Sequence, residues 1–107
     1  PYSTKADILV SDGDELKVGD VTLKFIHTPG HTEGGMCIYV KEAKALFSGD
    51  TLFRQSIGRT DFPGGSYKEI MDSIRKKLFL LPDDTNVFPG HMGMTSIGFE
   101  KENNPFV

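Results

Sequence analysis

Hydrophobic and polar residues alternate near the start of the chain in the way that is typical of β-strands. The segments 15–18 and 21–26 both alternate, and the Gly19-Asp20 pair between them predicts a type I′ hairpin turn. Two later runs, 36–40 and 45–48, are rich in β-forming residues and are separated by a charged turn. The pattern therefore predicts a hairpin followed by two further strands.

A helical pattern follows in the second half of the chain. Residues 51–66 contain several glycines and a proline, which predicts a long loop. Ser66 then precedes Glu69 by three residues, which is the spacing of a helix capping box. Apolar residues recur at helical spacing up to Pro82, which cannot continue a helix. This apolar stripe consists of Ile70, Ile74, Leu78 and Leu81.

Three shorter segments complete the prediction. Residues 8–10 form an apolar entry run, residues 86–88 form a short strand, and residues 96–104 contain a short helix. The order of strands and helices favours an α+β arrangement. In such folds, functional residues usually lie where strands pass into loops.

The composition is that of an ordinary globular domain. The chain has 107 residues, of which 37% are hydrophobic and 25% are charged, so it forms one domain or a piece of one. A net charge of -3 argues against a nucleic-acid partner, which would favour a basic surface. No apolar run is long enough to span a membrane. The single cysteine, Cys37, excludes an internal disulfide and indicates a reducing, cytoplasmic environment.

Three candidate metal ligands share one local context. His31, Asp50 and His91 each follow a glycine at the end of a β-prone run. The glycine lets the backbone turn sharply beside an ion, and the strand before it fixes the direction of the turn. Two histidines and a carboxylate suit zinc, iron or manganese. We therefore expect their metal-binding atoms to lie within about 6 Å of one another. An exposed loop histidine or a turn-capping aspartate would have the same local sequence.

Other polar residues allow more than one interpretation. His27 continues the alternation of segment 21–26 and is expected to be a hydrogen-bonded core histidine or a group that supports a ligand. Cys37 lies in an apolar strand and is expected to be an inert core residue. Arg59 lies in the long loop near Asp61, where it forms either a surface ion pair or a contact with substrate.

Three motifs, in order along the chain, resemble the metallo-β-lactamase superfamily. They are Thr-Pro-Gly-His-Thr-Glu-Gly-Gly at 28–35, Phe-Ser-Gly-Asp-Thr-Leu-Phe at 47–53 and Phe-Pro-Gly-His at 88–91. The segments 57–66 and 95–106 are similar to its hydroxyacylglutathione hydrolase (glyoxalase II)-like branch. The resemblance implies an αββα sandwich with a two-metal site at one edge, of which this chain is one sheet-plus-helix half.

The resemblance also implies a role for each candidate residue. In this family the site combines an HxHxDH motif with a later histidine, a bridging aspartate and a final histidine. His31 matches the third ligand of the first metal, Asp50 the bridging carboxylate and His91 the last ligand of the second metal. Arg59 aligns with a basic residue that contacts the thioester substrate. The implied cofactor of the intact protein is a pair of Zn²⁺ ions, with iron or manganese as alternatives.

The sequence departs from the family pattern in two respects. No HxHxDH motif precedes His31, so residues 1–107 are expected to be the C-terminal half of the domain, without its N-terminal half. Met92 and Gly93 follow His91, where glyoxalase II enzymes place a substrate-contacting tyrosine. The absent half would supply the remaining metal ligands.

The implied activity is hydrolysis of thioesters of the S-2-hydroxyacyl-glutathione type by a metal-bound hydroxide. The isolated chain is expected to be inactive, because it supplies only part of the ligand set. Two alternatives remain open. One is a persulfide dioxygenase-like enzyme with a single iron, whose relatives share the stretch at 58–62, and the other is a non-catalytic half-fold fragment.

Half of such a sandwich would expose an apolar sheet face. Monomeric proteins rarely leave a large contiguous apolar surface in water. We therefore expect a companion, either the N-terminal half of the same fold or a second copy of this chain. The residues expected on this face include Leu23, Phe25, Ile38, Val40, Leu46 and Phe47.

Overall fold

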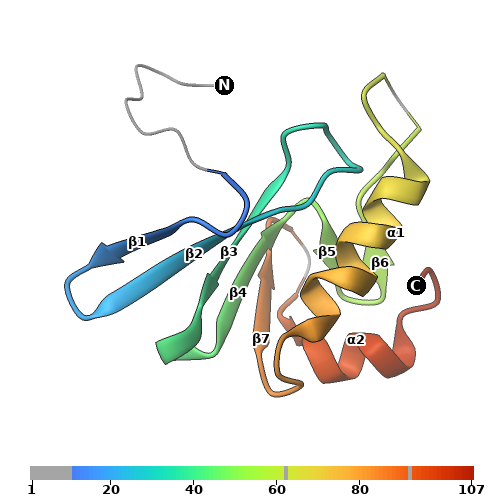
Figure 1. Ribbon diagram of the computed structural model, residues 1–107. Helices are drawn as coiled ribbons and strands as arrows, with labels where there is room; N and C mark the ends of the chain where they lie inside the picture. The colour runs from blue at the N-terminus through green and yellow to red at the C-terminus, as the bar shows by residue number, and fades with distance from the viewer. Residues whose placement is uncertain (1–10, 62, 92) are drawn as a thin grey trace.

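One mixed sheet carries most of the secondary structure of the chain (Figure 1). The computed structural model describes residues 11–61, 63–91 and 93–107, so the apolar run at 8–10 lies outside the described residues. The sheet has six strands in the order β1-β2-β3-β4-β7-β8. Their bounds are β1 (Glu15–Val18), β2 (Val21–His27), β3 (Met36–Val40), β4 (Ala45–Gly49), β7 (Asn86–Pro89) and β8 (Thr95–Ser96).

The strand pairing follows the predicted hairpin and then changes direction. β1 and β2 are antiparallel around the turn at Gly19, which adopts a positive φ of 62°, whereas Asp20 does not, so the predicted type I′ turn is wrong. β3 and β4 continue the antiparallel sheet, and β4 then pairs with β7 in parallel. A parallel pair needs a crossover connection. The segment between these strands supplies it and contains helix α1 (Tyr67–Lys76).

Only the serine half of the predicted capping box is present, because the Ser66 amide donates to the Gly30 carbonyl at 2.7 Å and not to the Glu69 side chain, and the helix ends earlier than predicted. The Ser66 hydroxyl accepts a hydrogen bond from the Glu69 amide at 3.2 Å. The α-helix stops at Lys76, and a 3₁₀ turn, η2 (Leu78–Leu80), replaces the predicted last turn. Lys77 leaves the helical region with φ −124°, while its ammonium donates to the His27 carbonyl oxygen at 2.6 Å. This anchor and the extended backbone before Pro82 end the helix there.

The predicted long loop at 51–66 contains a small hairpin, so that prediction was wrong in part. β5 (Leu52–Phe53) and β6 (Ser56–Ile57) pair antiparallel in a separate two-stranded sheet. The predicted C-terminal helix is present as α2 (Ile97–Asn103), and the short strand β8 before it was not predicted. Strands of two residues are too short for any hydrophobic period to be detected.

The core lies on one face of the sheet, beneath both helices. The predicted helical stripe is buried there, with Ile70, Ile74 and Leu78 fully inaccessible to solvent. The strands and the C-terminal helix contribute Ile26, Cys37, Tyr39, Leu46, Leu52, Val87 and Ile97 to the same cluster. Leu46 therefore faces the helices, and its predicted place on the outer face is wrong.

The opposite face of the sheet carries a row of apolar side chains that no described helix covers. The strand registers place Phe25, Ile38, Phe47 and Phe88 side by side across four strands. Phe47 and Phe88 are stacked, with ring centroids 5.4 Å apart, and are 47% and 37% exposed. Val40, which was also expected to be exposed here, is only 6% exposed. Within the described residues, no helix has the length and apolar character needed to cross a membrane.

Candidate metal centre

The three candidate ligands meet at one edge of the sheet, although they are far apart in sequence. β4 and β7 are parallel neighbours, so Asp50 and His91 leave the sheet at the same edge. The Gly90 amide donates to the Gly49 carbonyl at 2.8 Å and holds the two turns together. His31 reaches the same place from the loop that follows β2. The Nε2 atom of His31 lies 3.7 Å from Oδ2 of Asp50, and Nδ1 of His91 lies 3.4 Å from Oδ1.

A backbone carbonyl orients the His31 ring. Nδ1 of His31 lies 2.9 Å from the carbonyl oxygen of Arg59. A carbonyl oxygen only accepts, so Nδ1 must donate, and in the neutral ring Nε2 then carries the lone pair. That lone pair is on the side of the ring that faces Asp50. Metal-binding histidines are commonly held in this way by a partner on the other ring nitrogen.

Glycines allow the backbone segments around Asp50 to approach closely. Gly49, immediately before Asp50, has a positive φ of 53°. A Cβ at Gly58 would lie 1.9 Å from the Asp50 carbonyl oxygen and 3.2 Å from the His31 Cβ. A Cβ at Gly90 would lie 3.3 Å from Oδ1 of Asp50. A side chain would therefore clash at Gly58, be tightly packed at Gly90 and strain the backbone at Gly49.

Replacing Gly58 by alanine should displace Asp50 or the segment that follows Gly58. We expect Gly58→Ala to lower the metal content of the full-length protein about tenfold or more, since misplacing a supporting group typically costs 10- to 100-fold in metal affinity. Atomic emission analysis after dialysis measures this effect. The control is Gly34→Ala, because a Cβ at Gly34 would meet nothing within 4 Å. Equal metal contents in the two variants would contradict the close approach.

The candidate ligands line an open surface, not an enclosed cavity. The side chain of His31 is 25% exposed, that of Asp50 46% and that of His91 71%. The ring of His91 packs against Phe53, with centroids 5.7 Å apart. These side chains form one wall of a site, and a substrate would need a second wall to be held.

A buried layer of small polar residues supports the site from below. The hydroxyl groups of Thr28 and Thr51 lie 3.1 Å apart, and the Thr28 hydroxyl lies 3.4 Å from the Cys37 sulfur. Cys37 is fully buried, and burial raises the pKa of its thiol. The thiol therefore stays protonated and unreactive at neutral pH. The prediction that Cys37 is an inert core residue is confirmed.

His27 is hydrogen-bonded but does not approach the candidate ligands. Its Nε2 atom lies 2.8 Å from the Glu33 carbonyl oxygen, and its amide donates to Asp12 at 2.9 Å. This amide bond lowers the pKa of Asp12, with a further contribution from Lys77. His27 lies on the outer face of the sheet in register with Met36 and is half-buried, so it is not a core residue. It ties the loop that carries His31 to the sheet.

Arg59 contacts the site through its backbone, while its side chain forms the surface ion pair considered above. The guanidinium Nε donates to Oδ1 of Asp61 at 3.1 Å, and the Arg59 side chain is 74% exposed. The hydrogen bond from Arg59 lowers the pKa of Asp61. The backbone carbonyl of Arg59 holds His31. Sequence reasoning missed this role because a backbone carbonyl has no residue-type signature.

The three candidate side chains do not by themselves complete a metal site. Among the residues that the structure describes, no three His, Cys, Asp or Glu side chains are close enough together to hold one ion. Instead, each histidine faces a different oxygen of Asp50. A protein zinc site normally has at least three protein ligands. Residues outside the described set would therefore have to complete each coordination shell.

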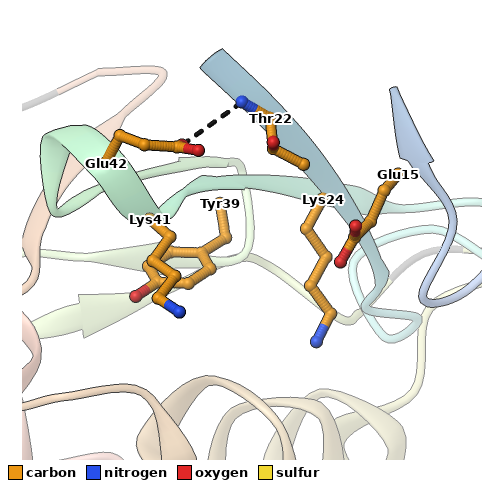
Figure 2. A pocket seen from close by; sticks show the side chains of 6 residues that line it. All are labelled: Glu15, Thr22, Lys24, Tyr39, Lys41 and Glu42. Atoms are coloured by element: carbon orange, nitrogen blue, oxygen red, sulfur yellow. Dashed lines mark hydrogen bonds between the residues drawn. The ribbon is translucent and has the colours of Figure 1, made fainter. Parts of the chain in front are cut away.

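The chain also has a hollow far from these residues (Figure 2). It has a volume of about 390 Å³ and is lined by Glu15, Thr22, Lys24, Tyr39, Lys41 and Glu42. Two carboxylates offset the two lysines, and one of these carboxylates, Glu42, already accepts from the Thr22 amide at 3.2 Å. None of the candidate ligands lines this hollow, and its mixed charge favours no particular class of ligand.

Comparison with protein families gives a match over most of the chain. Residues 1–91 match the model of the metallo-beta-lactamase superfamily. The chain is 45% identical to the hydroxyacylglutathione hydrolase GloC of Haemophilus influenzae over 90% of its length and 45% of the relative's. It is 42% identical to the probable metallo-hydrolase YqgX of Bacillus subtilis over 95% of its length and 48% of the relative's. The chain thus spans about half the length of the curated relatives it matches.

Solved structures match the fold equally well. The structure of the BLEG-1 B3 metallo-beta-lactamase superposes with a TM-score of 0.89 at 44% identity, over 94% of this chain and 48% of that one. ETHE1 from Myxococcus xanthus gives a TM-score of 0.89 at 38% identity, over 96% and 47% of the two chains. TTHA1623 in a di-iron-bound form gives 0.85 at 36% identity, over 100% and 52%. The predicted α+β fold class is confirmed, and the chain matches about half of each structure.

Proposed function

Because the chain belongs to the metallo-β-lactamase superfamily, we propose that the protein it forms part of is a metal-dependent hydrolase of thioesters of the S-2-hydroxyacyl-glutathione type. The observation that supports this most directly is Asp50, whose two carboxylate oxygens each face a different histidine. The 45% identity to a hydroxyacylglutathione hydrolase supports the substrate class. The proposed cofactor is a pair of zinc ions, with iron or manganese as alternatives.

The residues of this chain would divide the work of holding the metals. Asp50 would share its carboxylate between them, with His31 on one side and His91 on the other. The Arg59 carbonyl accepts from Nδ1 of His31, so in the neutral ring the lone pair lies on Nε2, which faces Asp50. When bound, paired zinc ions lower the pKa of coordinated water toward about 7 and polarise a carbonyl group. No serine or cysteine nucleophile is required, which agrees with the burial of Cys37.

Arg59 is the proposed contact for the thiol-bearing part of the substrate. Its guanidinium is exposed beside the site and would exchange its contact with Asp61 for a substrate carboxylate. Arg59→Ala in the full-length protein should raise KM for a charged thioester about tenfold and leave metal content unchanged, because the backbone carbonyl remains in place. Steady-state kinetics measure this change. The control is Arg75→Ala on the exposed side of α1. An equal KM in both variants would mean that the Arg59 side chain forms only its ion pair with Asp61 and does not contact the substrate.

One experiment on the full-length protein tests the function itself. Metal analysis is combined with assays of thioester hydrolysis and of oxygen consumption in the presence of a persulfide. Two metals per chain with thioester hydrolysis would support the proposal. One iron with oxygen consumption would support the persulfide dioxygenase-like alternative, with which the similarity to ETHE1 is compatible. If the full-length protein contains no metal and shows neither activity, the non-catalytic interpretation remains.

The remaining assignments concern the surroundings of the chain. We propose a cytoplasmic location, with which the buried free thiol of Cys37 in this chain is compatible. The proposed companion is the other half of the sandwich, which would supply the missing ligands and the second wall of the site. A small-molecule thioester is the proposed ligand, and neither nucleic acid nor membrane is expected to bind.

A further inference from the structure

The small hairpin β5–β6 and the residues on either side of it adjoin all three candidate ligands of the metal centre. Asp50 lies at the start of the segment that enters it, and the side chain of Phe53 packs against His91. Where the chain leaves the hairpin, the Gly58 amide donates to the Thr51 carbonyl at 3.1 Å. The next residue is Arg59, whose carbonyl holds His31. The hairpin therefore adds to the β4–β7 pairing in placing the three ligands relative to one another.

The turn of this hairpin is not favoured by its own sequence. Gln55 has a positive φ of 56°, which is a costly conformation for a residue with a side chain. Strands of only two residues also provide few hydrogen bonds of their own. An isolated hairpin of this size would not be stable in water. Contacts from elsewhere in the chain must hold it in place.

Glu100 on α2 makes the contact that holds the turn. It is fully buried, and its Oε1 atom accepts from the Gln55 amide at 2.9 Å. The same oxygen accepts from the Asn104 side-chain amide at 2.9 Å, and Oε2 accepts from the Thr95 hydroxyl at 2.5 Å. No ion pair to Glu100 is found among the described residues. A buried carboxylate is costly to place without such donors, and these three bonds give each of its oxygens a partner.

Two further contacts connect the same helix region to the hairpin. The Asn104 side-chain amide also donates to the Ser56 carbonyl at 3.0 Å. The guanidinium carbon of Arg54 lies 5.6 Å from the centre of the Phe99 ring. Each residue from 54 to 56 thus has a partner in α2 or just after it. The turn lies at one end of the hairpin and the candidate ligands lie at the other.

We propose that Glu100, assisted by Asn104, is a positioning residue for the metal centre, acting through the β5–β6 hairpin. This inference rests on the proposed function only in so far as the three ligands bind metal. Glu100 is not itself a ligand and touches no candidate ligand in the contacts described above. Its role is to hold the turn, so that Asp50, His91 and the Arg59 carbonyl keep their places.

The test compares Glu100→Ala with Glu100→Gln in the full-length protein. Glutamine keeps the two bonds accepted by Oε1, and its amide can donate to the Thr95 hydroxyl. We expect Glu100→Ala to weaken Co²⁺ binding about 10- to 100-fold and to change the visible spectrum of the bound Co²⁺, as loss of a supporting group does. Glu100→Gln should retain most of the affinity. Leu78→Ala, which opens a cavity in the same core, should lower the stability of the protein. The Co²⁺ affinity and the visible spectrum of the folded Leu78→Ala variant should stay unchanged.

Amide hydrogen exchange gives a second readout that does not depend on metal. In Glu100→Ala, the Gly58 amide should exchange at least tenfold faster, while the Ile70 amide, which donates to Ser66 in α1, should keep its wild-type rate. Wild-type Co²⁺ affinity and Gly58 exchange in folded Glu100→Ala would overturn the proposal. If that variant does not fold, Asn104→Ala carries the same test. If the wild-type protein binds no Co²⁺, the proposed function fails, and Gly58 exchange alone decides the role of Glu100.

Discussion

Replacing Asp50 by alanine in the full-length protein should remove metal from both proposed positions at once. Each oxygen of this carboxylate faces a different histidine, so one substitution deletes a ligand from each metal. Loss of supporting groups alone typically costs 10- to 100-fold in affinity. We therefore expect the loss of a shared ligand to lower metal affinity and thioester hydrolysis by ~100-fold or more.

Metal analysis and steady-state kinetics measure the two effects. Asp84→Ala is the matched control. This exposed carboxylate pairs with Lys44 at 2.8 Å, at the ends of β4 and β7 opposite to the candidate ligands. The control should retain metal and activity. An Asp50→Ala protein with two metals per chain would show that Asp50 only caps its turn, which is the simpler interpretation of its local sequence.

The isolated 107-residue chain should associate through the outer face of its sheet. Phe25, Ile38, Phe47 and Phe88 form a continuous apolar row, and Leu16 on β1 adds to this face with 38% of its surface exposed. Burying apolar surface contributes roughly 25 cal/mol per Å², so covering ~600 Å² would contribute on the order of 15 kcal/mol as an upper estimate. That exceeds the total stability of many domains.

Sedimentation velocity at micromolar concentration tests this expectation. The double variant Phe47→Glu with Phe88→Glu should abolish self-association, because it places like charges on neighbouring strands of the contact face. Leu80→Glu is the control, since Leu80 is 77% exposed but lies in η2 on the helix side. A monomeric wild-type chain that melts cooperatively and binds no hydrophobic dye would be inconsistent with a need for a companion.

The sequence by itself determined the candidate ligands, because each one is marked by its neighbours. A glycine after a β-prone run, followed by histidine or aspartate, is a local pattern that can be recognised without knowing the fold. The helix cap at Ser66 and the turn at Gly19 are local in the same sense. Each of these features depends only on residues within three or four positions of one another in the sequence. That these ligands hold metal stays a prediction.

The face on which a strand residue lies was harder to determine from the sequence. Residues 45–47 are all apolar, so alternation does not indicate whether Leu46 or Phe47 faces the core. Pairing of β4 between β3 and β7 decided it: Leu46 is in register with Val87 and buried, while Phe47 is in register with Phe88 and exposed. A shift of one residue in register would have exchanged the two faces.

Only the tertiary structure decided how the ligands are held together. The Arg59 carbonyl on His31 and the Glu100 carboxylate on the Gln55 amide join segments 28 and 45 residues apart in sequence. One partner in each bond is a backbone group that almost every residue type offers, so the identity of that residue does not mark the contact. The β5–β6 hairpin is likewise too short to show a period. Local chemistry could therefore indicate which side chains would bind, whereas the long-range backbone contacts that position them required the folded chain.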